Sequence, residues 1–222
     1  NENRTDHEWE MGPYRDHVKK LDPTRPVLRS GEDTAETDDM HICNNLERAE
    51  GQWVRLMLER GRNRDARRTL SNTEYMNYLI SRQNISTRLL GAPDHPDERL
   101  VFAEFAVEHT EVMRRLGYDL LLPYMYAGWT RLRTGNDWRP DYPTPMAAAL
   151  HSCMSPILAS IDLHDRNFMA GRQVTSSLML INETPQDVKT TLDVYITPRN
   201  PLFVPDQAAL DAALSRQSME VT

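Results

Sequence analysis

The sequence has few of the features that mark several classes of protein. Cysteine occurs twice in 222 residues, at Cys43 and Cys153, far apart and away from any histidine-rich cluster, so we expect two buried free thiols. No apolar run approaches the roughly 18 residues of a membrane span, and no glycine-rich phosphate loop is present. Basic residues are not in excess: the net charge of −7 argues against nucleic acid or a membrane surface as partner.

The composition that remains is that of a globular protein. Hydrophobic residues make up 39% of the chain and charged residues are mixed along it. The length suits one sizeable domain, or one domain with a smaller second one. The cellular compartment stays open, because two cysteines and three Asn-X-Ser/Thr sequons (Asn3, Asn84 and Asn182) occur readily by chance.

Helical and strand patterns alternate over residues 1–164. Short apolar runs predict strands, and runs with helical spacing lie between and after them. Strands are expected within 25–31, 38–45, 66–75 and 118–129, and helices within 13–23, 51–61, 99–117 and 144–161. Apolar strands in alternation with helices are typical of a parallel α/β sheet.

Proline and glycine mark the expected helix ends. Pro13 suits a first helical turn, whereas Gly61 and Gly117 are expected to cap the C-terminal ends of two helices. Pro156 is expected to interrupt the helix over 144–161.

The pattern changes at about residue 165. Two segments rich in Val, Thr, Leu and Ile lie within 173–196, separated by the turn-forming residues Asn-Glu-Thr-Pro, with no helical pattern between them. This predicts antiparallel structure and a second, sandwich-type domain over 165–222. Residues 206–217 are expected to form a helical turn or two.

Polar and aromatic residues follow the predicted strands. Four strand–helix units in a row predict half of a (β/α)8 barrel, in which chemistry lies at the C-terminal strand ends. The residues found there include two glutamates from non-adjacent strands, Glu2 and Glu74, and neighbouring aromatic and amide side chains.

The order of these motifs resembles glycoside hydrolase family 2, which contains β-galactosidases, β-glucuronidases and β-mannosidases. The similar segments are the opening Asn1-Glu2, "LDPTRPVL" at 21–28, "NTEYMNY" at 72–78 and "YAGW" ending at Trp129. The resemblance covers nearly the whole chain. It implies the C-terminal half of a TIM barrel over 1–164 (strands 4/5 to 8), then an incomplete immunoglobulin-like β-sandwich over 165–222.

The resemblance also implies a retaining mechanism with two carboxyl groups. Glu2 would be the general acid/base and Glu74 the nucleophile, about 5–5.5 Å from each other. Glu74 and partial burial would raise the pKa of Glu2 and keep it protonated. Asn1 would bind the sugar hydroxyl next to the anomeric carbon.

Further residues at the strand ends would complete the site. His41 or Asn44 would orient Glu74 or bind a hydroxyl, and Tyr75 would contact the substrate next to Glu74. Trp129 would offer an apolar face to the C–H side of a pyranose ring. The residues after Glu74 differ from the run found in the best-known β-galactosidases, so the resemblance does not fix the sugar.

The expected partner is a carbohydrate, without nucleic acid or membrane, and a homo-oligomer stays open. No cofactor is implied; a structural Mg²⁺ or Na⁺ ion stays open, because such sites use scattered oxygens. Under the resemblance, barrel strands 1–4 would precede Asn1, so the isolated chain is expected to be inactive. The alternatives are a non-catalytic carbohydrate-binding or structural module, and an endo-acting glycanase with the same two glutamates.

Overall fold

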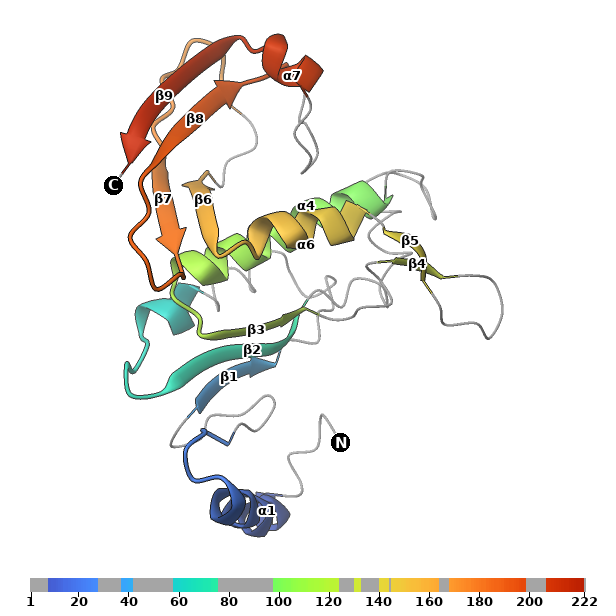
Figure 1. Ribbon diagram of the computed structural model, residues 1–222, viewed down its shortest axis with the longest axis vertical. Helices are drawn as coiled ribbons and strands as arrows, with labels where there is room; N and C mark the ends of the chain where they lie inside the picture. Colours follow the sequence, from blue (N-terminus) through green and yellow to red (C-terminus); the bar gives the residue numbers. More distant parts are fainter. Residues whose placement is uncertain are drawn as a thin grey trace. The chain divides into compact units, whose positions relative to one another are not determined.

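Figure 1 shows the computed structural model of the chain, and the residues it describes form nine ranges: 8–27, 37–41, 58–75, 98–123, 130–132, 140–143, 145–163, 168–198 and 207–221. The chain divides into two compact units. The first contains residues 1–95 and 116–126, and the second contains residues 96–115 and 127–222. The first unit is therefore discontinuous in sequence.

The first unit contains a parallel three-stranded sheet. Its strands are β1 (Thr37–His41), β2 (Thr69–Tyr75) and β3 (Leu120–Pro123), in the order β1-β2-β3 (Figure 1). Each lies in a segment predicted to be a strand of a parallel sheet, and that prediction is confirmed for these three. Residues 28–31 of the first predicted strand lie outside the described residues. No sheet in the described ranges closes on itself, so the half-barrel remains a prediction.

The central strand β2 is covered on both faces. Leu70, Ser71, Asn72 and Tyr75 are each at most 2% exposed. Because successive side chains of a strand point to opposite faces, burial of three consecutive residues means that neither face is open to solvent. This is the environment expected of a central strand in a parallel sheet.

An ion pair fixes the start of β3 against β2. Both terminal nitrogens of Arg64 act here: Nη2 lies 2.8 Å from each carboxylate oxygen of Asp119, and Nη1 donates to the carbonyl of Gly117. Asp119 Oδ2 accepts from the backbone N–H of Leu70 at 2.9 Å, and the N–H of Asp119 donates to the carbonyl of Leu70 at 2.8 Å. Gly117 has φ 74°, so its predicted role as a helix cap is confirmed.

Helix α1 (Glu8–Leu21) begins earlier than expected. Pro13 lies inside the helix instead of in its first turn. Gly12 precedes it and lacks the Cβ that would meet the proline ring in a helical conformation. The apolar stripe of α1 is on the surface, with Val18 45% and Leu21 75% exposed.

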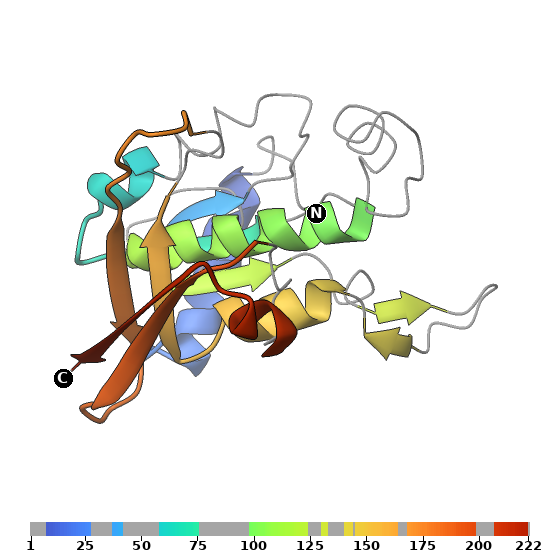
Figure 2. The same ribbon diagram turned by 90° about the horizontal axis from the view of Figure 1, so that it is seen from above.

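The second unit is built on two packed helices. Helix α4 (Glu98–Arg115) lies against α6 (Pro145–Cys153), as Figures 1 and 2 both show. Their buried residues are Ala103, Ala106, Thr110, Val112, Met113, Arg114, Met146, Ala149, Leu150 and Cys153. No helix in the described part of the chain is long and apolar enough to cross a membrane.

Cys153 is a buried free thiol, as predicted for it. Burial raises its pKa to about 11, so the thiol stays protonated at neutral pH. Cys43 lies outside the described residues.

The helix predicted over 144–161 is wrong beyond Cys153. Residues Ile157–Asp162 form strand β6, which pairs antiparallel with β7 (Ser177–Asn182). Pro156 stops the helix because it has no N–H for the next helical hydrogen bond. Beyond it, Leu158 and Ser160 are buried and their neighbours are exposed, which is the period of a strand.

The predicted antiparallel structure within 173–196 is confirmed for β7 and for β8 (Thr190–Ile196). These two strands pair with other partners: β7 with β6, and β8 with β9 (Ser215–Val221). The helix predicted over 206–217 is shorter, α7 (Gln207–Asp211), and its expected end is part of β9. A further two-stranded pair joins β4 (Thr130–Leu132) to β5 (Pro140–Pro143). The sandwich and the division at residue 164 remain predictions.

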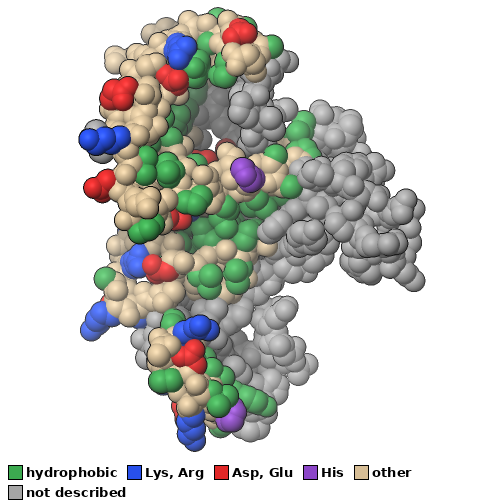
Figure 3. Space-filling model, viewed as in Figure 1, with side chains coloured by type: hydrophobic (Ala, Val, Ile, Leu, Met, Phe, Trp, Pro, Cys, Tyr) green, Lys and Arg blue, Asp and Glu red, His purple; other side chains and the backbone are tan. Residues whose placement is uncertain are grey.

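Hydrophobic side chains remain on the surface of the second unit (Figure 3). On the β6–β7 pair, Ile157, Ile161 and Leu180 are 46%, 45% and 39% exposed. The register places Leu180 opposite Ala159, between the two isoleucines, so the three share one face.

Candidate active site

The C-terminal edge of the parallel sheet carries the candidate site. His41 is the last residue of β1, and Glu74 and Tyr75 end β2. In the register, His41 is the partner of Glu74, and Tyr75 is the partner of Pro123 at the end of β3. Paired strands lie about 4.8 Å apart. The backbone therefore brings together two of the residues that were predicted to act together.

The regular pairing is interrupted at this edge. The register shifts between Asp39 and His41 on β1, and between Asn72 and Tyr75 along β2. Such irregularities bend a strand and change the direction of its side chains, and they are frequent next to active sites. Both shifts occur within the last few residues before the strands end.

Tyr75 is buried in this arrangement. Its side chain is 2% exposed, which favours packing of the ring in the interior over contact with a substrate. Its predicted role in sugar binding stays a prediction. Asn72 belongs to the same motif but is not among the predicted site residues. It lies inside β2 and is 1% exposed. Apart from this motif, nothing in the sequence predicts that the amide two residues before Glu74 is buried.

The other predicted site residues lie outside the described residues. These are Asn1, Glu2, Asn44 and Trp129. The structure therefore does not bring Glu2 and Glu74 together or keep them apart. No group of three His, Cys, Asp or Glu side chains that could hold a metal ion is found among the residues described.

Glu111 on α4, whose pKa is shifted, belongs to a structural network. Ser160 donates to Glu111 Oε2 at 2.6 Å, and Arg115 donates to Ser160 and lies 3.4 Å from Asp162. Burial of Glu111 raises its pKa, against the opposing effects of Ser160 and Arg115. Ser160 is fully buried at the centre of this network, which links α4 to β6.

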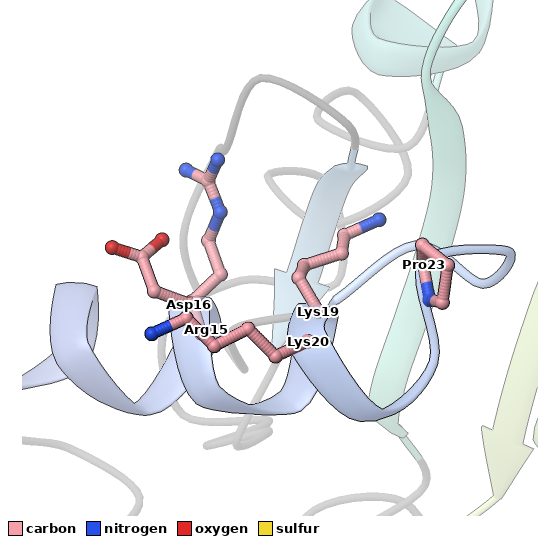
Figure 4. Close-up of a pocket in the computed structure, with 5 residues that line it drawn as sticks. All are labelled: Arg15, Asp16, Lys19, Lys20 and Pro23. Atoms are coloured by element: carbon pink, nitrogen blue, oxygen red, sulfur yellow. The ribbon is translucent and has the colours of Figure 1, made fainter.

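A surface hollow lies on helix α1, and none of the predicted site residues lines it. It is lined by Arg15, Asp16, Lys19, Lys20 and Pro23, four of them on α1 and one in the turn after it (Figure 4). Lys19 Nζ donates to the carbonyl of Arg25 at 2.8 Å, which engages one of the basic groups locally. The lining contains no pair of carboxylates, so it does not suit the chemistry predicted for Glu2 and Glu74.

Comparison of the chain with protein-family models, with curated proteins and with solved structures found no match. The candidate site is therefore defined by the motifs and by the sheet register.

Proposed function

We propose that this chain is part of a retaining glycoside hydrolase that cleaves β-glycosidic bonds, with Glu74 as nucleophile and Glu2 as general acid/base. The observation that carries the proposal is the pairing of His41 with Glu74 at the C-terminal edge of a parallel sheet. In barrels built from such sheets, catalytic residues come from the ends of several strands at this edge. The proposed protein is a partial TIM barrel followed by a partial sandwich.

The reaction would proceed by double displacement. The ionised carboxylate of Glu74 attacks the anomeric carbon while Glu2 gives its proton to the leaving oxygen, and the glycosidic bond breaks. This yields an ester between the sugar and Glu74. Glu2, now ionised, removes a proton from water, the hydroxide formed attacks the anomeric carbon, and Glu74 leaves as carboxylate.

His41 would act on Glu74 as its neighbour. A ring N–H that donates to the carboxylate would favour the ionised form that attacks and would fix its orientation. The register supports this role, because it makes the two residues backbone partners on adjacent strands. Hydrogen bonding of a sugar hydroxyl by His41 is the other role that fits the same position.

The test is to trap the covalent intermediate on the gene product that carries this chain. Dinitrophenyl 2-deoxy-2-fluoroglycosides of β-galactose, β-glucuronic acid and β-mannose are the probes, because the fluorine slows breakdown of the glycosyl–enzyme ester. Peptide mass spectrometry is expected to find the label on Glu74. Glu74→Gln is expected to abolish labelling and to lower turnover by at least about a thousandfold with the fold retained.

Glu108→Gln is the matched control, since Glu108 is an exposed carboxylate on α4. This variant should label and turn over like the parent. A label on a different carboxylate, or Glu74→Gln activity within tenfold of the parent, would mean that the nucleophile is another residue. Sugar binding without any label or turnover would favour a non-catalytic carbohydrate-binding module.

A further inference from the structure

We draw no further inference here: the strongest candidate, the exposed apolar face of the β6–β7 pair formed by Ile157, Ile161 and Leu180, carries none because nothing in the part of the chain that the structure describes shows what covers it.

Discussion

At the scale of single residues, Arg114 is a buried cation of the second unit that contacts two backbone carbonyls and a carboxylate. Its side chain is 3% exposed, and its Nη1 donates to the carbonyls of Cys153 and Ser155 at 2.6 and 2.7 Å. Its Nε donates to Glu183 Oε1 at 3.3 Å, and its Nη2 lies 3.1 Å from Glu183 Oε2. One guanidinium thus satisfies one carbonyl at the end of α6 and one just after it, and neutralises a carboxylate after β7.

We expect Arg114→Met to lower the free energy of unfolding by about 2–4 kcal/mol, because two carbonyls lose their donor and Glu183 loses its partner. Urea unfolding measures the change. Glu183→Gln is the control. It removes the charge of an acid that is 56% exposed and leaves an amide oxygen that can still accept from Arg114, so its cost should stay below about 1 kcal/mol. Equal effects of the two variants would show that the carbonyl contacts contribute little.

His109 gives α4 a dependence on pH. Burial lowers its pKa from 6.5 to about 4, so between these values the unfolded chain binds a proton that the folded chain does not. Its contribution to stability is therefore complete above about pH 6.5 and is lost as the pH falls toward 4. A shift from 6.5 to about 4 corresponds to a loss of about 3 kcal/mol in the free energy of unfolding. We expect a loss of about 1–2 kcal/mol, because part of the His109 side chain stays accessible to solvent.

Urea unfolding at pH 7 and at pH 5 tests this expectation. Most of the loss should be present at pH 5, and His109→Gln should remove it, since an amide does not titrate. The raised pKa of Glu111 acts in the opposite direction, since it favours the folded state as the pH falls. His151→Gln, at an exposed position of α6, is the control and should keep the parent's pH dependence. An unchanged pH dependence in His109→Gln would contradict the assignment.

At the scale of elements, two glycines illustrate how a helix end is fixed. Both were predicted as C-terminal caps, and Gly117 is one. Gly61 instead lies within the helical residues 58–62. A Cβ at this position would be 2.7 Å from the Cβ of Leu116, so glycine is needed for close approach of two segments. The prediction for Gly61 is wrong because the helix continues past it. The contact that requires glycine there is made by Leu116, which is 55 positions away in the chain and cannot be predicted from the local sequence.

We expect Gly61→Ala to lower the free energy of unfolding by about 1–2 kcal/mol. A helical alanine would gain up to about 1 kcal/mol over glycine, but the contact with Leu116 costs more. Leu116→Gly should relieve the contact, because it removes the Cβ that the new alanine would meet, so the double variant should be more stable than the sum of the two single changes predicts. Thermal unfolding of the four proteins measures this coupling. Strict additivity would show that the two segments do not touch.

The elements that could be predicted are those whose signal is local. The apolar run of β3 and the helical spacing of α4 are readable because both are features of a single segment of sequence. The segment of β6 was misread because six residues that follow an apolar helix fit either period. Its pairing with β7 makes this segment a strand, and a pairing partner cannot be predicted from the segment alone.

At the scale of the whole molecule, the proposed reaction depends on two carboxylates from distant parts of the sequence. Glu2 and Glu74 must approach to about 5–5.5 Å for a retaining mechanism. A register partner within the sheet is known for Glu74, whereas Glu2 lies outside the described residues. The role of Glu2 can therefore be tested by measuring turnover of substrates with different leaving groups, without knowledge of its position.

We expect Glu2→Ala to affect substrates according to their leaving group. A poor leaving group needs the proton that Glu2 supplies, so alkyl glycosides should lose about 100-fold or more in turnover and dinitrophenyl glycosides much less. Azide should restore turnover of the activated substrates by attacking the glycosyl–enzyme ester, with formation of the glycosyl azide. Equal losses on both substrates without azide rescue would contradict the assignment. Glu108→Gln again serves as the unaffected control.

Local patterns in the sequence were enough to predict the strands β1, β2 and β3, the helix α4, the antiparallel character of β7 and β8, and the free thiol of Cys153. These depend on local hydrophobic period and on composition, which a chain carries in its own residues. The folded structure was needed to show that His41 is the register partner of Glu74, that Tyr75 is buried and that Gly61 lies against Leu116. Each of these facts joins residues separated by tens of positions, or depends on what covers a side chain, and neither is contained in the spacing of residues along one segment.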